Sequence, residues 1–432
     1  MTAERGDDTI AALSSGQPPA AVAIIRTSGP TAFAAAEELA GTLPPPRRAA
    51  LRTLRDPRNG ATLDQVLLIR FDRPSSSTGE DIVEYQCHGG RAVVRSILDA
   101  LLARPDMRAA EPGEFTRRAF ANGRIDLTEA EGLADLLEAE TERQRRAALK
   151  AADGGVRRLV EGWRTRIVML SARAEAAIDY VGDEDETGTD VDALADEARA
   201  LADELADWLE RPRAEPLKQG IRVVAAGPPN AGKSSLINAL SQTERAIVTA
   251  VAGTTRDVIE VPLAFGGIPF VLIDTAGLRG GGDVVEQIGI ERAQSEVTRA
   301  DILLWLGEPG EAPNHPRLIQ LHPRSDAAGR EFVPVGAQTV SSVTGSGIDG
   351  LIQTLVECAA EILPGEDHVA LNQRQANEIT VAHAALQQSS AVDLVLLADS
   401  LRRAREAMDR ITGRAGIDDM LDALFGRFCL GK

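Results

Sequence analysis

Aromatic side chains, cysteines and long apolar runs are all scarce in this chain of 432 residues. Aromatic residues make up only 3% of it, so its hydrophobic cores must be built from Leu, Val, Ile and Ala. The three cysteines, Cys87, Cys358 and Cys429, match no zinc or disulfide spacing, which favours a reducing compartment. No apolar run approaches a membrane span, and the polar segment Met1–Asp8 does not resemble a signal peptide. We therefore expect a cytoplasmic protein with no membrane contact.

An excess of basic charge is also absent, because the net charge is −18 at pH 7. This argues against whole-surface attraction to nucleic acid or anionic lipid. Contact with RNA phosphate would need a local patch, and two arginine clusters are the candidates. We favour solvated helix faces for both clusters and keep RNA contact as the alternative. The clusters are Arg143, Arg145 and Arg146, and Arg402, Arg403 and Arg405.

The composition and the hydrophobic periodicity of the sequence change at three points along the chain. This predicts four segments that together form three domains. Residues 1–122 mix short strand-like runs with turns rich in Pro, Gly and Ser, which predicts an α/β domain. Residues 123–218 and 371–432 show helical periodicity, and residues 219–370 alternate strands with helices. We expect a helical bundle made of two chain pieces, with a mostly parallel P-loop domain inserted between them.

The expected strands and helices follow from these patterns. The predicted strands are Ala21–Ile25, Val66–Phe71, Ile82–Cys87, Ile221–Ala226, Pro269–Ile273, Ile302–Leu306, Leu318–Leu321 and Phe332–Val335. The predicted helices are Glu129–Leu149, Val191–Leu209, Gln373–Gln387, Asp393–Thr412 and Ile417–Phe428.

A phosphate-binding loop is the most specific signal in the chain. Residues 227–235 read G-P-P-N-A-G-K-S-S, which fits the pattern G-x-x-x-x-G-K-S/T after a predicted strand. Backbone amides of such a loop turn toward phosphate oxygens, Lys233 reaches the outer phosphates and Ser234 holds Mg²⁺. A predicted helix starting at Lys233 adds its positive end. The alternative, a tight glycine turn without ligand, is disfavoured by this context.

Two further elements follow at the spacing of a GTPase. Asp274-Thr275-Ala276-Gly277 closes a predicted strand, where a GTPase places an acid near Mg²⁺ and a glycine amide near the γ-phosphate. Residues 253–257, G-T-T-R-D, supply a threonine that binds Mg²⁺ only while the γ-phosphate is present. We interpret the ligand as GTP rather than ATP.

The position after Gly277 holds Leu278, which cannot orient an attacking water as glutamine does in many GTPases. Asn230 offers a side-chain oxygen for a monovalent cation, whose charge would replace that of an arginine finger. The alternative is that Asn230 only shapes the loop.

The guanine-reading end departs from the usual Asn-Lys-x-Asp. Pro323-Arg324-Ser325-Asp326 stands in its place, so Asp326 can still accept from guanine but the asparagine amide is missing. Ser341-Ser342-Val343 stands where a Ser-Ala-Lys element is expected. These departures predict that GTP is still preferred over ATP, but by a smaller margin.

Several separated signatures resemble the MnmE (TrmE) family of tRNA modification GTPases over nearly the whole chain. They are residues 8–12 (D-T-I-A-A), 25–30 (I-R-T-S-G-P), 79–90 with C-H-G-G at its end, 111–120 (E-P-G-E-F-T-R-R-A-F) and 428–432 (F-C-L-G-K). The resemblance implies an N-terminal folate-binding and dimerising domain, a helical domain and an inserted Ras-like G domain. It also implies a homodimer that works with the flavoprotein MnmG on wobble uridine of certain tRNAs, using GTP, Mg²⁺, K⁺ and 5-formyl-tetrahydrofolate or a related folate.

The resemblance assigns residues to these ligands. For K⁺ they are Asn230, Thr249, Val251 and Thr254, for Mg²⁺ Ser234 and Thr255, and for the attacking water Glu286. GTP would contact Asn230, Ala231, Gly232, Lys233, Ser234, Ser235, Thr249, Ala250, Val251, Ala252, Gly253, Thr254, Thr255, Asp274, Thr275, Ala276, Gly277 and Asp326. The folate would contact Arg26, Glu84, Arg124 and Lys432.

Two alternatives to this function remain open at the level of sequence. A ribosome-assembly GTPase of the Era or Der type would share the switch motifs but not the N-terminal signatures or the Cys-Leu-Gly-Lys end. A scaffold with a decayed G domain is favoured by the altered base-reading elements and opposed by the intact phosphate loop. For Cys429 a packed thiol is favoured over a nucleophile, and for His88 a structural role over a base.

Overall fold

The computed structural model describes residues 8–179, 191–243, 247–248, 259–275, 294–365, 368–388, 393–415, 421, 424–426, 428 and 431. The chain forms two compact units, the first made of residues 1–134 and 412–432 and the second of residues 135–411. No helix in these described ranges combines the length and the apolar character needed to cross a bilayer.

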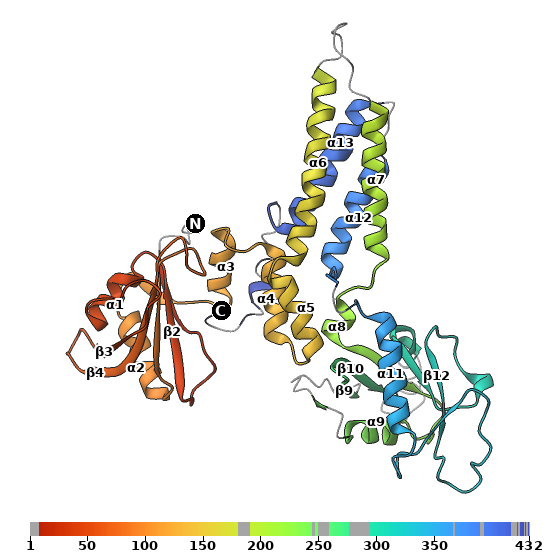
Figure 1. The fold of residues 1–432 in the computed structure, drawn as a ribbon. Helices are drawn as coiled ribbons and strands as arrows, with labels where there is room; N and C mark the ends of the chain where they lie inside the picture. The colour runs from red at the N-terminus through yellow and green to blue at the C-terminus, as the bar shows by residue number, and fades with distance from the viewer. Residues whose placement is uncertain are drawn as a thin grey trace, which may run out of the picture. The chain divides into compact units, whose positions relative to one another are not determined.

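The first unit is built on a six-stranded sheet with the order β3-β4-β5-β2-β1-β6 (Figure 1). Strands β1 to β5 pair antiparallel with their neighbours, and β6 pairs parallel with β1. The strands are β1 (Thr9–Leu13), β2 (Val22–Ser28), β3 (Ala50–Arg55), β4 (Thr62–Phe71), β5 (Ile82–His88) and β6 (Met107–Ala109).

The two faces of this sheet are covered differently. Because side chains alternate along each strand, neighbouring residues belong to opposite faces. Along β2, Ala23 and Ile25 are fully buried in a core shared with α1 (Ala32–Ala40) and α2 (Arg91–Leu102). Ile24 and Arg26 point the other way and are only partly buried. The helices thus cover one face and leave Arg26 on the opposite one.

Part of that opposite face is covered by α3 (Glu114–Ala121), whose Phe115 packs on Ile10 and Ala12 of β1. The chain then enters α4 (Leu127–Glu138), where Ala130 and Ala134 pack with Phe425 and Phe428. The last part of the sequence therefore belongs to the same unit as the first.

The second unit contains a helical bundle whose core draws on two distant stretches of sequence. Helices α6 (Gly155–Asp179) and α7 (Val191–Glu210) pack with α12 (Gln373–Gln387) and α13 (Leu394–Thr412) around Trp163. Figure 1 shows the four helices side by side. Helix α5 (Glu142–Ala152) precedes them and α8 (Glu215–Gln219) follows α7.

Between the two bundle pieces lies a seven-stranded sheet with the order β13-β12-β11-β7-β10-β9-β8. The pairs from β13 to β10 are parallel, and β9 and β8 extend the sheet antiparallel. Its elements are β7 (Ile221–Ala226), α9 (Lys233–Ser241), β8 (Ile247–Val248), β9 (Ile259–Phe265), β10 (Ile268–Asp274), β11 (Ile302–Trp305), η2 (Pro309–Glu311), β12 (Leu318–Pro323), β13 (Gln338–Val340) and α11 (Ile348–Ile362).

The predicted fold class is confirmed: an α/β unit, an all-α bundle and an inserted P-loop domain on a mostly parallel sheet. Two element predictions are wrong. The expected helix Glu129–Leu149 is interrupted, because Thr141 forms a capping box with Gln144 that starts α5 anew. The expected strand Phe332–Val335 is an exposed loop, with Phe332 84% and Val335 101% exposed, and Gln338–Val340 pairs with β12 instead.

Candidate functional site

The phosphate loop has the predicted strand–loop–helix geometry. Strand β7 ends at Ala226, the loop turns through residues 227–232, and α9 begins at Lys233. Gly227 and Gly232 have φ of +148° and +100°, which non-glycine residues rarely adopt. A Cβ on Gly227 would also lie 3.2 Å from the Leu306 carbonyl carbon, so the loop needs glycine for space as well.

Lys233 lies within this loop and is only 5% exposed. Its Nζ donates hydrogen bonds to the carbonyl oxygens of Gly227 (3.0 Å) and Pro228 (2.9 Å). The ammonium group therefore stands where the loop closes, next to the N-terminus of α9. Ala231 lies in the loop before Lys233, and Ser235 lies in the first turn of α9.

Ser234 and Asp274, the two described residues whose chemistry suits a magnesium ion, meet beside the ends of the neighbouring parallel strands β7 and β10. Asp274 is paired in register with Ala225 of β7, and Ser234 Oγ donates a hydrogen bond to Asp274 Oδ2. Thr275 Oγ1 donates to the Ala225 carbonyl (2.8 Å), which joins the end of β10 to β7 by a side-chain hydrogen bond. A hydroxyl and a carboxylate in contact fit a hard cation such as Mg²⁺. The described residues hold no group of three or more His, Cys, Asp or Glu that could bind a metal without substrate oxygens.

The base-side loop is tied to the phosphate loop by a contact that the sequence analysis missed. Arg324 Nη2 donates a hydrogen bond to the Asn230 carbonyl (2.7 Å) across 94 residues of sequence. Asp326, two residues further on, is exposed. Behind the loop, buried Ser341 accepts hydrogen bonds from the amides of Val343 (3.3 Å) and Thr344 (3.1 Å). The sequence signal that could have indicated this contact was Arg324, the cationic residue in the altered Asn-Lys-x-Asp element.

Many of the predicted site residues lie outside the described part of the chain, so the geometry given above does not include them. These are Thr249, Ala250, Val251, Ala252, Gly253, Thr254, Thr255, Ala276, Gly277, Leu278, Glu286, Cys429 and Lys432.

In the first unit, the predicted folate residues Arg26 and Glu84 lie directly opposite each other on β2 and β5. The Arg26 guanidinium donates to Glu84 Oε1 from Nε (3.0 Å) and Nη2 (2.7 Å) and lies over the Phe115 ring, 5.6 Å from its centroid. Arg124 is exposed beyond the end of α3. Guanidinium groups that donate to carboxylates and a carboxylate that accepts from a pterin ring fit a folate.

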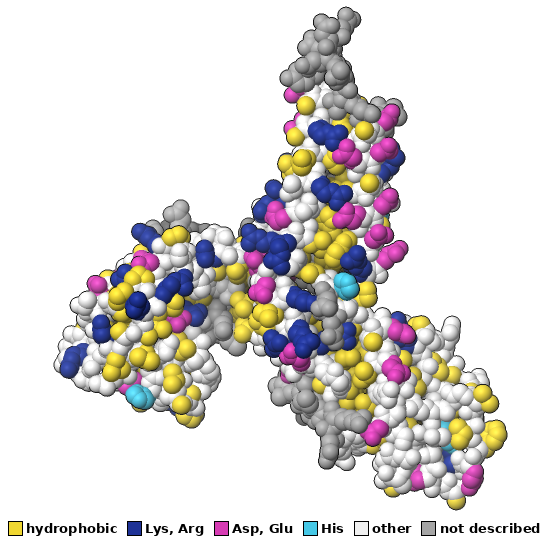
Figure 2. All heavy atoms as spheres, viewed as in Figure 1, with side chains coloured by type: hydrophobic (Ala, Val, Ile, Leu, Met, Phe, Trp, Pro, Cys, Tyr) yellow, Lys and Arg dark blue, Asp and Glu magenta, His cyan; other side chains and the backbone are white. Residues whose placement is uncertain are grey.

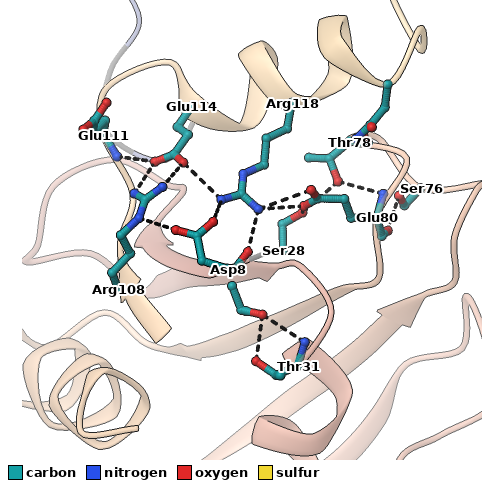
Figure 3. Close-up of polar contacts among 12 residues, drawn as sticks. Asp8, Ser28, Thr31, Ser76, Thr78, Glu80, Arg108, Glu111, Glu114 and Arg118 are labelled. Carbon is teal, nitrogen blue, oxygen red and sulfur yellow. Dashed lines mark hydrogen bonds and ion pairs between the residues drawn. The ribbon is translucent and has the colours of Figure 1, made fainter. Parts of the chain in front are cut away.

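A buried ionic network adjoins these residues, centred on Arg118 of α3 (Figure 3). Arg118 is 6% exposed and contacts Asp8, Glu80 and Glu114. Burial alone would raise the pKa of the Glu114 carboxyl, but hydrogen bonds from Arg108 and the Glu111 amide, with both arginine charges, bring the pKa below its usual value. Despite burial, the pKa of the Asp8 carboxyl is also below its usual value, because Arg108 and Arg118 donate hydrogen bonds to it, so Asp8 and Glu114 are held ionised around the arginines.

Several other residues named in the sequence analysis have surroundings that favour structural roles. Cys87, which was not a candidate nucleophile, is buried, and burial raises the pKa of its thiol to about 11, so the reactive thiolate is disfavoured. His88 Nδ1 lies 2.8 Å from Asp64 Oδ1. Arg145 and Arg146 pair with Glu142, and Arg402 pairs with Asp399 and Glu406. Figure 2 shows acidic and basic side chains interspersed along the bundle, as expected for solvated helix faces.

Strand β7, its glycine-rich loop and α9 define a P-loop nucleotide hydrolase. The family model "GTP-binding protein TrmE N-terminus" matches residues 9–124, and the model "MnmE helical domain" matches residues 127–429. The chain belongs to the MnmE family of tRNA modification GTPases.

Curated relatives agree with this over the full length. The tRNA modification GTPase MnmE of Erythrobacter litoralis is 53% identical over 427 residues, covering 98% of this chain and 100% of that protein. The protein of the same name from Novosphingobium aromaticivorans is 50% identical over 436 residues, again covering 98% and 100%. The likeness extends through the first unit, which argues against a GTPase of the Era or Der type.

Proposed function

We propose that this protein is a K⁺-stimulated, Mg²⁺-dependent GTPase that acts in tRNA modification. With the flavoprotein MnmG, it would form the (carboxymethyl)aminomethyl group at carbon 5 of wobble uridine in certain tRNAs. The observation that carries the proposal is the contact of Ser234 with Asp274 beside a buried Lys233, in a chain of this family.

The proposed roles follow from the chemistry of each side chain. Lys233 and the loop amides hold the phosphates of GTP, and Asp274 keeps Ser234 oriented toward the metal position. Asn230 contributes an oxygen to the K⁺ position together with Thr249, Val251 and Thr254, and Thr255 joins Ser234 at Mg²⁺. Glu286 orients the attacking water. When bound, the two cations supply the positive charge that stabilises the developing phosphate charge.

The first segment, residues 1–122, is proposed to bind folate and to dimerise. Arg26, Glu84, Arg124 and Lys432 would hold the folate, which supplies the one-carbon unit. Residues 219–370 would form the G domain, and residues 123–218 with 371–432 the helical domain that links the two. Support comes from the Arg26–Glu84 pair and from the packing of Phe425 and Phe428 in the first unit.

Phosphate release from GTP in K⁺ and in Na⁺ tests the cation role. We expect the rate in K⁺ to exceed that in Na⁺ by at least about tenfold, as for a charge that replaces an arginine finger. Asn230→Ala should remove most of this difference, whereas Asn238→Ala, an exposed asparagine of α9, should not. Equal rates in both salts would overturn the cation role. Nucleoside mass spectrometry of a deletion strain with unchanged wobble uridine would overturn the tRNA role.

A further inference from the structure

Two of the described folate candidates, the arginines Arg26 and Arg124, are supported by different elements of the first unit. Arg26 of β2 stacks on Phe115, which is part of α3. Arg124 packs on the loop 76–81, because a Cβ on Gly79 would lie 3.3 Å from Arg124 Cγ. Their spacing therefore depends on how α3 and this loop are fixed to each other.

Helix α3 is fixed from its buried side by Glu114 and Arg118, which lie one turn apart. Arg118 Nη2 donates to Glu114 Oε1 (3.1 Å) and Asp8 Oδ1 (2.7 Å), and its Nη1 donates to the Asp8 carbonyl (2.9 Å). Phe115 follows Glu114 directly, so this anchoring sets the position of the ring beneath Arg26.

The loop 76–81 is held by the same guanidinium. Arg118 Nη1 donates to both carboxylate oxygens of Glu80, at 3.2 and 3.1 Å, and Glu80 Oε2 accepts from Ser28 Oγ (2.7 Å). Ser28 also lies 2.7 Å from Thr78 Oγ1 and is two residues from Arg26 on the same side of β2. Figure 3 shows Arg118 reaching Glu114 and Asp8 in one direction and Glu80 in the other.

Asn122 completes the link to Arg124. Its Nδ2 donates to the Thr78 carbonyl (2.7 Å), and its Cβ would lie 2.9 Å from a Cβ on Gly79. The end of α3 and the loop are thus in direct contact at the residue on which Arg124 rests.

Arg108 provides a natural comparison within the same network. It contacts Asp8 Oδ2 (2.5 Å) and both oxygens of Glu114 (2.8 and 2.5 Å), and no contact joins it to Glu80 or to the described loop 76–81. Its side chain is 36% exposed, against 7% for Arg118. The two arginines share Glu114 of α3 and Asp8 as partners, but only Arg118 also contacts the loop 76–81.

We propose that Arg118 is a positioning residue that sets the spacing of Arg26 and Arg124 and thereby the affinity of the site for a folate's carboxylates. This inference rests on the proposed folate site. A buried arginine that joins three carboxylates from three parts of the chain cannot be replaced without moving at least one of them, because an unpaired buried charge is costly.

Isothermal titration of the full-length protein with 5-formyl-tetrahydrofolate tests the proposal. Arg118→Met should raise the Kd by about tenfold or more, the size of a lost charge-assisted hydrogen bond. Arg118→Lys, which keeps the charge without the planar fork, should fall between this variant and the wild type. Arg108→Met, the matched control, should leave the Kd within about twofold of the wild type.

A glutamate-free analogue that also lacks the benzoate carboxylate, 5-formyl-6-methyl-tetrahydropterin, distinguishes an effect on positioning from a general loss of structure in the site. The analogue should bind wild type and Arg118→Met alike, because it lacks the carboxylates whose partners have moved. If Arg118→Met does not fold, Glu80→Gln tests the same link from the loop side and should also raise the Kd for the folate.

Three results would contradict the proposal. They are an unchanged Kd in Arg118→Met or Glu80→Gln, an equal loss in Arg108→Met, and an equal loss for the glutamate-free analogue. A wild-type protein that binds no folate would instead overturn the proposed folate site itself, and the role of Arg118 with it.

Discussion

Asn230 and Arg324 both adopt left-handed backbone conformations, with φ of +61° and +57°, although neither is glycine. A single hydrogen bond joins them, from the Arg324 guanidinium to the Asn230 carbonyl. Each such conformation costs on the order of 1 kcal/mol and persists only where its surroundings fix it. The strain therefore lies at both ends of the contact that holds the phosphate loop and the base-side loop together.

Glu114 gives a pH-dependent prediction at the same scale. Its pKa is lowered in the folded state, so its ionised form stabilises the first unit above the unfolded pKa of about 4.3. This stabilisation is lost as the pH falls through the lower folded pKa. Glu114→Gln should cost on the order of 2 kcal/mol at pH 7 and flatten the fall in stability between about pH 5 and pH 3.

Calorimetry of the first unit's transition at several pH values measures this. The tryptophan fluorescence transition is an internal control, because Trp163, Trp208 and Trp305 all belong to the second unit. An unchanged pH slope in the variant would show that Glu114 does not carry the acid sensitivity.

At the scale of elements, the sequence predicts a helix or strand correctly where local signals alone decide the structure. The helix Gln373–Gln387 was predicted with the observed bounds because an apolar stripe follows Asn372, which forms a capping box with Gln375. The run Phe332–Val335 misled because its β-branched composition fits a strand, whereas pairing with β12 is decided by tertiary register.

The candidate sites also differ in whether local sequence is enough to find them. The phosphate loop could be found from residue spacing, because all of its groups lie within one loop and one helix turn. The Arg118 network could not, since Asp8 and Arg118 are 110 residues apart and only the β1–α3 packing joins them. The strand β1 itself, Thr9–Leu13, was not predicted.

Gly431 offers a test of how the end of the chain is attached to β1. Its φ is +91°, a Cβ there would lie 2.0 Å from the Leu13 carbonyl oxygen, and its own carbonyl accepts from Ser14 Oγ (2.8 Å). Gly431→Ala should displace residue 431 from Leu13 and Ser14 and increase the sensitivity of the chain to limited proteolysis at this point.

Gly60→Ala is the matched control, because Gly60 has φ of +73° with no atom within 4 Å of its added Cβ. Both variants should lose about 1 kcal/mol to the left-handed conformation, and only Gly431→Ala should lose more. Identical stability and proteolysis in the two variants would mean that the contact with Leu13 is not formed.

At the scale of the whole molecule, the chain leaves the first unit after residue 134 and returns to it at residue 412. The candidate folate residues Arg26, Glu84 and Arg124 all belong to the first unit, and the phosphate loop belongs to the second. Each unit also has its own buried core. Two ligands of different chemistry should therefore stabilise different cooperative units.

Scanning calorimetry with tryptophan fluorescence tests this division. GDP with Mg²⁺ at about 100 times its Kd should stabilise the second unit by about 2.7 kcal/mol and raise the fluorescence transition, because a ligand stabilises only the state that binds it. The folate at the same saturation should raise the first unit's transition and leave the fluorescence unchanged, since all three tryptophans lie in the second unit. A single transition that both ligands raise equally would mean that the two units unfold as one, and the coupling between GTP and folate would then be thermodynamic in the resting protein rather than dependent on turnover.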